Sequence, residues 1–333
     1  MDQRNDFSGV LLVLAAGILW GTVGPAQVLA ESPASPVALG DARILSGGLL
    51  LAAFVLATAP RAFRGLTRAT WRPLLAASAA TGIFQPAFLT AVDRTGAAVA
   101  TAIVFGLVPV TTGVCERLVL RTRLTRRWTY GTACAIAGCA LLMMPGAAGS
   151  PDPLGLGLAL IAGCCFGVYT VSAKILSGCE INMAAAVAVT LLIGGTALLP
   201  WALLNDLSGP TDLTGLADLT DTRSLVLIAW LGPVATTVAY MCFVIGLRRV
   251  TAATAGTLSL AEPLVAALLA LAVLGERLPP PAAAGAIVLL GGLVVVSVPG
   301  RLRRSPRARS DGPLCLPDVT GADKVDSTTG ERS

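Results

Sequence analysis

Residues 251–274 read TAATAGTLSLAEPLVAALLALAVL, and Glu262 is the one charged residue among them. A run of about 20 mostly apolar residues is long enough to cross a membrane as a helix. Glu262 would lie about 16 Å along such a helix, near the bilayer centre, where inserting a charge costs about 2.5 to 3.5 kcal/mol. Pro263 follows at once and removes a helix hydrogen bond. The stretch therefore predicts a membrane-spanning helix that carries an acid and a kink at mid-membrane.

The whole chain has the composition of a membrane protein. Its 333 residues are 55% hydrophobic and only 13% charged, whereas about 25% of a soluble domain is charged. The apolar runs are continuous and about twice as long as the strands of a membrane barrel. We therefore predict an all-α integral membrane protein with ten transmembrane helices. The expected spans are 8–29, 38–59, 73–92, 96–118, 128–145, 154–177, 183–204, 223–246, 251–274 and 281–299.

The basic residues predict how these spans are oriented. If the N-terminus is placed inside the cell, all but four of the 24 Lys and Arg residues fall on the cytoplasmic side, as such residues do in membrane proteins. The exceptions, at expected outer helix ends, are Arg43, Arg94, Arg223 and Arg277. We predict a multi-pass protein of the cell (plasma or inner) membrane with both termini cytoplasmic. The net charge of +5 then reflects this bias and indicates no nucleic-acid partner.

The last residues of the chain differ from the rest. Residues 301–333 are first basic and then rich in Gly, Asp, Thr and Ser, without a periodic apolar pattern. A segment of this composition cannot bury enough apolar surface to fold by itself. We expect 301–333 to be a disordered cytoplasmic tail.

The two halves of the chain match each other. RTGAAVATAIVFGLVPVTTG at 94–113 aligns without gaps with RRVTAATAGTLSLAEPLVAA at 248–267, which places Pro109 on Pro263. The same shift of 154 residues aligns two more pairs of glycines, Gly131 with Gly285 and Gly138 with Gly292. A shift of 146 residues aligns the first helices, Gly17 with Gly163, Trp20 with Phe166 and Gly21 with Gly167. The chain is therefore expected to be a tandem repeat.

Each repeat has five expected helices, and an odd number makes the second copy enter the membrane from the opposite side. We expect an inverted repeat with its first copy in 1–150 and its second in 151–300. Related bundles of this kind surround a site near the bilayer midplane in many secondary transporters. A duplicated bundle without transport is the structural alternative.

Three stretches carry a resemblance to a known family: GILWGTVGPAQ at 17–27, the arginine of DARILSGGLLL at 41–51, and AYMCFVIGLRRVTAATAGTLSLAEPLVAALLALAVLGERL at 239–278. They resemble the EamA-type permeases of the drug/metabolite transporter superfamily, over about residues 8–300. The resemblance implies a ten-helix inner-membrane transporter of small metabolites, often an exporter, with a central cavity. The first half departs from the pattern, because it has Val108 where the second has Glu262.

Glu262 is the first candidate site residue. An acid inside a membrane is by default functional, so Glu262 is expected to bind a proton or the solute. Its structural alternative is a hydrogen bond to the Ser259 carbonyl, which Pro263 leaves without a donor. Pro109 and Pro263 are expected to kink their helices, either lining a cavity or only shaping the helices. Arg43 is marked by the resemblance, and either binds an anionic solute group, closes an outer gate, or extends to the membrane surface.

Aromatic and polar residues inside the apolar runs form the second set of candidates. A cavity lined by aromatic surface with a few polar anchors is typical of a small-molecule site, although each of these residues could instead pack in the core. The set consists of Trp20, Phe84, Gln85, Phe166, Tyr169, Trp230 and Tyr240. Trp20, Gln85, Phe166, Tyr169 and Tyr240 are the members predicted to bind the solute or a proton. Glu116 lies at an expected inner helix end, where it is expected to be solvated or to cap a loop.

The chain contains no histidine, which removes Ser–His nucleophiles and most zinc sites. It has no GxxxxGK[ST] motif for ATP. We expect no enzyme activity, metal or cofactor. The sequence predicts a secondary active transporter, a permease or exporter of a small organic metabolite or drug-like solute, working by alternating access with proton exchange or by facilitated diffusion. The alternative is a non-transporting membrane receptor or scaffold. The solute, the direction and the choice between monomer and homodimer stay open.

Overall fold

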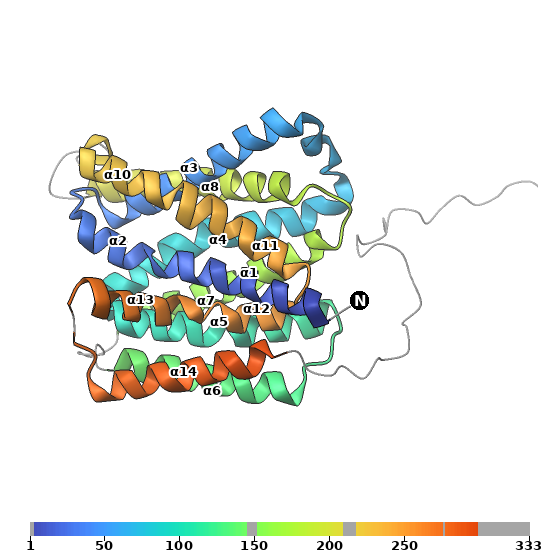
Figure 1. Ribbon diagram of the computed structural model, residues 1–333. Coiled ribbons are helices and arrows are strands. Elements are labelled where there is room, and N and C mark those ends of the chain that lie inside the picture. The colour runs from blue at the N-terminus through green and yellow to red at the C-terminus, as the bar shows by residue number, and fades with distance from the viewer. Residues whose placement is uncertain (1–2, 145–151, 209–217, 276, 299–333) are drawn as a thin grey trace, which may run out of the picture.

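A computed structural model describes residues 3–144, 152–208, 218–275 and 277–298, and its long elements are all helices (Figure 1). The predicted tail, 301–333, lies outside the described residues. The first half contains α1 (Gln3–Gly21), α2 (Val23–Ala30), α3 (Pro36–Thr58), the 3₁₀ turn η1 (Pro60–Gly65), α4 (Arg68–Thr95), α5 (Ala97–Val119) and α6 (Arg126–Met143).

The second half repeats this order with more breaks. It contains α7 (Pro153–Ser177), α8 (Met183–Ser208), the short η3 (Asp218–Thr220), α10 (Thr222–Leu231), the π-helix η4 (Pro233–Val238), α11 (Ala239–Leu247), α12 (Ala252–Leu258), α13 (Ala261–Val273) and α14 (Pro280–Ser297). Each expected span coincides with one of these helices or with a run of them. The breaks within spans, between α1 and α2, at η4 and between α12 and α13, are features that the apolar pattern does not show.

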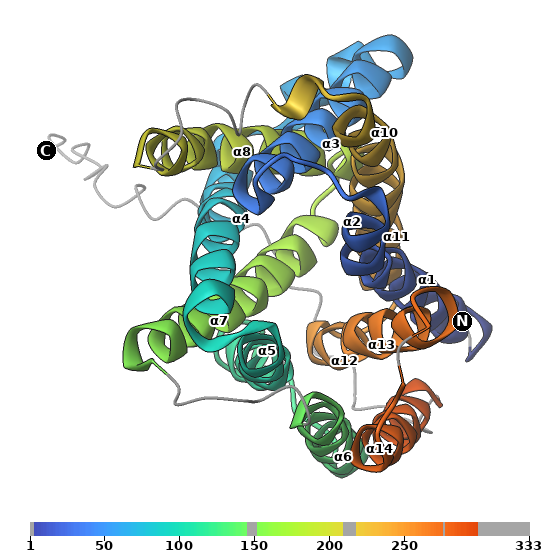
Figure 2. The ribbon, with the colours of Figure 1, turned by 90° about the vertical axis from the view of Figure 1, so that its left-hand side faces the viewer.

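Within the described residues, nine segments are long and apolar enough to cross a membrane. The fifth expected span corresponds to α6, an 18-residue helix that begins with Arg126 and Arg127 and is not one of the nine. Its place in the fold is nevertheless clear, because α6 lies along α14 at one edge of the bundle (Figure 2). Ten crossings therefore remain a prediction, while the all-helical membrane architecture is established.

Close packing of α6 against α14 shows how the two halves are related. A Cβ on Gly138 would lie 2.8 Å from the Gly285 carbonyl, and one on Gly292 would lie 2.7 Å from the Gly131 carbonyl. These glycines are the ones that the repeat alignment pairs, and small residues allow helices to approach this closely. The later residue of α6, Gly138, contacts the earlier residue of α14, Gly285, so these two equivalent helices lie antiparallel. The repeat is inverted.

The first helix of each half packs on the fourth span of the other half. A Cβ on Gly21 of α1 would lie 2.7 Å from the Cβ of Val265 in α13, and one on Gly167 of α7 would lie 2.7 Å from the Cβ of Thr111 in α5. Gly21 and Gly167 are equivalent, and so are Val265 and Thr111. Each half therefore uses the same contact to bind the other, and the core between them is shared.

The two equivalent prolines do not act alike. Pro109 lies inside α5, which runs without interruption from Ala97 to Val119. In the second half the span breaks at Ser259 and Leu260, and Pro263 falls in the first turn of α13, where a missing N–H needs no partner. The break therefore precedes the proline.

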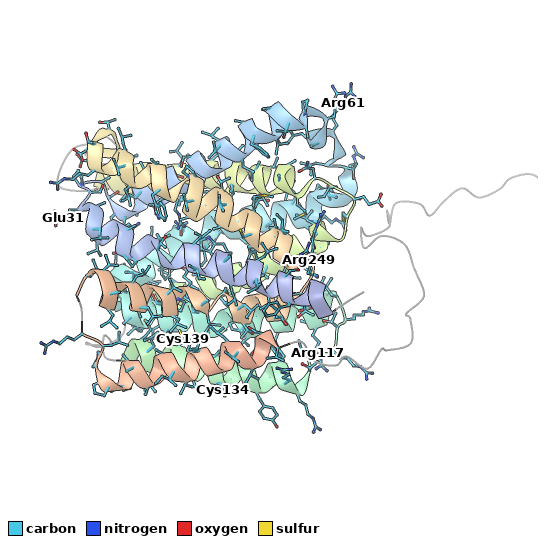
Figure 3. The ribbon with its side chains drawn as sticks, in the orientation of Figure 1. Glu31, Arg61, Arg117, Cys134, Cys139 and Arg249 are labelled. Carbon is cyan, nitrogen blue, oxygen red and sulfur yellow. The ribbon has the colours of Figure 1, made fainter. Side chains whose placement is uncertain are left out.

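The ends of the bundle differ in charge. Arg61, Arg117 and Arg249 all lie at the end that holds the N-terminus, whereas Glu31 lies at the other end (Figure 3). We call the first the basic end and the second the opposite end. The predicted orientation depends on this collection of arginines at one end. That the basic end faces the cytoplasm stays a prediction.

Candidate functional site

A cavity of about 60 Å³ lies between the two halves of the chain. Residues of α1, α3 and α4 supply the wall from the first half, and residues of α7, α11 and α13 supply the wall from the second half. The lining residues are Trp20, Arg43, Ile44, Ala80, Thr81, Phe84, Gln85, Cys165, Phe166, Tyr169, Tyr240 and Glu262. The cavity is therefore an interface between the two inverted repeats.

Two opposite charges line this cavity. Arg43 comes from the first half and Glu262 from the second, and the two side chains attract each other electrostatically. The buried Nε of Arg43 has no hydrogen-bond partner, and within the described residues the Glu262 carboxyl forms neither a hydrogen bond nor an ion pair. Buried polar groups are normally hydrogen-bonded, so this pair is free to bind a ligand.

The helix break positions Glu262. Glu262 is the second residue of α13, and its own backbone N–H donates to the Ser259 carbonyl at 3.0 Å. The carbonyl that Pro263 cannot reach is thus satisfied by the backbone, and the Glu262 side chain is not needed for it. A carboxylate in the first turn of a helix is also stabilised by the positive end of the helix dipole. Val108, at the equivalent place, lies in the middle of α5 and has no such helix start beside it.

Five of the twelve residues that line the cavity are aromatic. The ring centroid of Trp20 lies 5.4 Å from that of Tyr240 and 6.0 Å from that of Phe166, both in edge-to-face geometry. Tyr169 lies 5.6 Å from Tyr240, again edge-to-face. Rings in such contact hold one another in place, so the cavity has stiff apolar walls around its two charges.

Several polar groups near the charges have unused hydrogen-bonding capacity. Tyr169 is 6% exposed, and its buried hydroxyl has no partner in the part of the chain that the structure describes. The Oδ1 of Asp41, two residues before Arg43 on α3, is also buried without a partner among the described residues, although Asp41 does not line the cavity. Unpaired buried groups are unfavourable, and two of them, the Nε of Arg43 and the hydroxyl of Tyr169, belong to side chains that line the same cavity, as is typical of a binding site.

The π-helix η4 ends two residues before Tyr240. Its backbone N–H groups reach one residue further back than in an α-helix, as in the bond from Thr237 to the Gly232 carbonyl at 2.9 Å. Such π-helical turns occur frequently at functional sites. In the first half, α4 covers the equivalent region as a continuous helix with Pro86 inside, so the irregular backbone next to the cavity belongs mainly to the second half.

The structure brings together the seven side chains that the sequence predicts for solute or proton binding. They all line the cavity: Trp20, Arg43, Gln85, Phe166, Tyr169, Tyr240 and Glu262. Pro109 and Pro263 do not line it, because both are buried in helix packing.

Sequence reasoning missed the buried Asp41, and it missed that Glu116 is only 2% exposed. Both acids stand in apolar runs, and this position was the sequence signal that could have indicated them. Whether each side chain is buried depends on helix packing, which the sequence pattern does not give.

Comparison with known proteins decides the family. The model of the "EamA-like transporter family" matches residues 7–144 and again residues 153–298. The chain belongs to the EamA-like transporter family. The two matches coincide with the two inverted repeats, and membership favours transport over catalysis.

Relatives cover nearly the whole chain. One is named "Uncharacterized transporter YwfM" from Bacillus subtilis, which is 35% identical over 90% of this chain and 96% of its own length. Another is "Uncharacterized protein PA1977" from Pseudomonas aeruginosa, 29% identical over 92% of this chain and 98% of its own. A crystal structure with 19% sequence identity matches with a TM-score of 0.71, over 86% of this chain and 96% of that one. That likeness shows a shared fold.

Proposed function

We propose that this protein is a secondary transporter of a small organic solute and works by alternating access between its two repeats. The observation that carries the proposal is the pair Arg43 and Glu262, which come from opposite repeats and line one aromatic cavity, where the buried Nε of Arg43 has no hydrogen-bond partner among the described residues. An ionisable residue inside a membrane marks a solute or ion pathway by default. The family match and the relative named as a transporter support this reading.

The size of the cavity supports a moving mechanism. Sites for small molecules usually have volumes of about 300–1,000 Å³, and this cavity has about 60 Å³. A solute therefore fits only when the two walls separate. Because each wall belongs to a different repeat, rocking one repeat against the other opens the cavity to one side at a time.

Glu262 is the proposed coupling group. It binds either a proton or a cationic group of the solute, and Arg43 binds an anionic group. Neutralising Glu262 weakens its attraction to Arg43, so binding at one charge changes the affinity of the other. This arrangement makes solute binding dependent on pH in the wild type.

Flux into proteoliposomes tests the proposal. A metabolite panel is first screened by thermal shift, and the solute that stabilises the purified protein most is supplied in radiolabelled form. We expect uptake with wild type, none with protein-free liposomes, and a loss of uptake with Glu262→Ala. Glu262→Gln should keep residual uptake that no longer depends on pH. Glu180→Gln, the same change at an exposed glutamate, is the matched control.

Two outcomes would contradict the proposal. If Glu262→Gln and Glu262→Ala both transport at the wild-type rate with unchanged pH dependence, the coupling role of Glu262 is wrong. If a solute binds to the purified protein but no panel member crosses the membrane, the protein is a receptor or scaffold.

A further inference from the structure

Buried polar contacts join the two repeats near the basic end of the bundle. Glu116 of α5 is 2% exposed, and its carboxylate accepts the backbone N–H of Ala253 at the start of α12. Trp128 of α6 donates from Nε1 to the Ala253 carbonyl at 3.0 Å. One turn deeper, the hydroxyls of Thr132 and Thr257 form a hydrogen bond of 2.8 Å. The first repeat thus holds the start of α12 through three side chains.

A half-buried lysine holds the preceding helix. The ammonium of Lys174 on α7 donates to the carbonyls of Leu247 at 2.7 Å and Val250 at 2.8 Å. An ammonium stabilises the carbonyl end of α11, and a carboxylate stabilises the N–H end of α12. Lys174 and Glu116 therefore fix the 247–253 connection between these helices from its two ends, and their opposite charges also attract each other.

The opposite end of the bundle lacks these contacts. The repeat alignment places Ala270 at the position of Glu116 and Val28 at that of Lys174. It likewise places apolar side chains at the other positions: Ala282 for Trp128, Ala286 for Thr132 and Ile103 for Thr257. None of these side chains donates or accepts a hydrogen bond. The set of contacts therefore exists at one end of an otherwise symmetric frame.

The packing of the fourth and ninth spans has the same asymmetry. Near the basic end α12 packs along α5, whereas α13, the other part of the same span, makes no extensive contact with α5 among the described residues. Figure 2, viewed from the opposite end, shows α12 beside α5 and α13 further away. Along the fourth and ninth spans, the two repeats are in contact where these polar contacts lie and are further apart beyond them.

We propose that Glu116 and Lys174 form a latch that closes the basic end and biases the transporter toward the conformation in which its cavity opens to the opposite end. The latch includes the Thr132–Thr257 pair, and it rests on the alternating-access function proposed above. Neither charged residue lines the solute cavity. They are positioning residues, which set the balance between two conformations without contacting the solute.

Cys165 provides a reporter for this balance. It lines the cavity and is a free, half-buried thiol. A membrane-impermeant maleimide is added to right-side-out and to inside-out vesicles, and mass spectrometry follows alkylation of the peptide that contains Cys165. Cys165→Ser separates its signal from that of the neighbouring Cys164. The measured quantity is the ratio of the alkylation rates from the two sides.

Breaking the latch should raise the alkylation rate from the basic end relative to the rate from the opposite end. For the pair Glu116→Leu and Lys174→Met we expect roughly a tenfold shift, the size expected from losing hydrogen bonds to charged groups. Glu116→Gln keeps an acceptor for the Ala253 N–H and should shift the ratio less. Thr257→Val keeps the shape of the side chain and should shift it in the same direction. Glu180→Gln, an exposed change at the same end, should leave it unchanged.

The labelling experiment is independent of the solute. An unchanged ratio in Glu116→Gln and Thr257→Val, which serve if the double variant does not fold, overturns the latch. The same conclusion follows if no variant is labelled faster from the basic end. If the ratio shifts but no solute crosses the membrane, the latch stands and the proposed transport function is wrong.

Discussion

Arg43 of the first repeat and Glu262 of the second line the same cavity and attract each other. Each charge has an apolar residue at the equivalent position of the other repeat. Val108 stands at the position of Glu262, and Val189, at a shift of 146 residues, stands at the position of Arg43. The frame is symmetric and its charges are not. Because one charge belongs to each repeat, movement of the repeats changes the distance between them.

The charge pair should show strong coupling in a double-mutant cycle. Arg43→Met should lower the initial uptake rate about tenfold to a hundredfold, the range that the loss of a charge-assisted hydrogen bond to a solute implies. Adding Glu262→Gln to it should lower the rate by much less than the product of the single effects, because residues that act together are not additive. Initial-rate flux measurements give both numbers. Effects that simply multiply would show that the two charges act separately.

The hydroxyl of Tyr169 can be tested apart from its ring. Tyr169→Phe removes a buried hydroxyl that has no partner, so thermal stability should be unchanged or slightly higher. If the hydroxyl binds the solute, uptake should nevertheless fall. Tyr130→Phe is the matched control, because Tyr130 is 70% exposed on α6, and neither quantity should change there. A Tyr169→Phe variant with full uptake would limit Tyr169 to packing.

The α6–α14 contact should be sensitive to a single methyl group. Gly138→Ala and Gly285→Ala each force a Cβ against the backbone of the facing helix, and overpacking of this kind destabilises by about 1–3 kcal/mol. Gly291→Ala on α14 is the control, since its Cβ would meet no atom within 4 Å, and helix propensity then favours alanine by about 1 kcal/mol. Thermal melting in detergent measures all three. Equal melting temperatures would show that α6 and α14 do not pack this closely.

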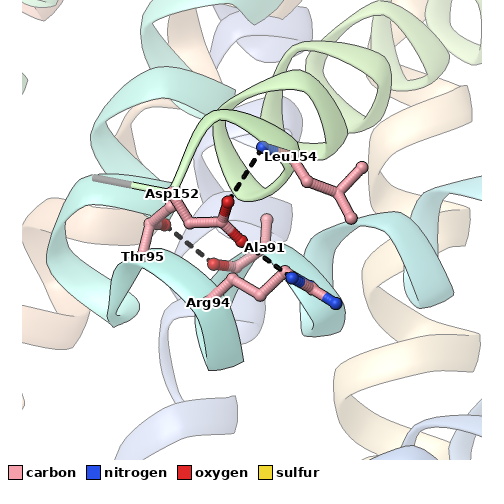
Figure 4. Close-up of polar contacts among 5 residues, drawn as sticks. All are labelled: Ala91, Arg94, Thr95, Asp152 and Leu154. Carbon is pink, nitrogen blue, oxygen red and sulfur yellow. Dashed lines mark hydrogen bonds and ion pairs between the residues drawn. The ribbon is translucent and has the colours of Figure 1, made fainter. Parts of the chain in front are cut away.

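Asp152 predicts a pH dependence at the opposite end of the bundle. It accepts a hydrogen bond from Arg94 at 2.8 Å and caps α7 through the Leu154 N–H (Figure 4). The Arg94 hydrogen bond, followed by that of Leu154, lowers the pKa of this carboxyl below its ordinary value of 3.8. Its stabilising effect is therefore present above about pH 4 and is lost as the pH falls through the lowered pKa.

Two variants separate the roles of Asp152. Asp152→Asn keeps the helix cap and removes the ion pair, so melting temperature should fall slightly and lose part of its acid dependence. Asp152→Ala also removes the cap, and its melting temperature should fall further. Because the group is exposed, added salt should weaken the ion-pair part of the effect. An acid transition identical in Asp152→Asn and wild type would show that the pair contributes nothing measurable.

The sequence alone determined the membrane class and the helix-rich inverted repeat, and it predicted positions for ten spans, of which nine coincide with helices long and apolar enough to cross a membrane among the described residues. Apolar runs and glycine spacing are local features, and each is needed wherever a helix crosses lipid or touches another backbone. The glycines that align between the halves are the ones that meet in the α6–α14 contact. Most of the seven candidate site residues were also found this way, because polar and aromatic groups in an apolar run are few, whereas Arg43 was marked by the family resemblance.

Only the tertiary structure decided how these residues are used. The alignment treats Pro109 and Pro263 as equivalent, yet the helix breaks only in the second half, at Ser259 and Leu260, where backbone and packing satisfy the free groups. The burial of Glu116 and the hydrogen bonds of Lys174 depend on helices distant in the chain. A side chain's partners across a bundle follow from packing, which a linear pattern does not contain, and so the cavity and the latch emerged from the fold.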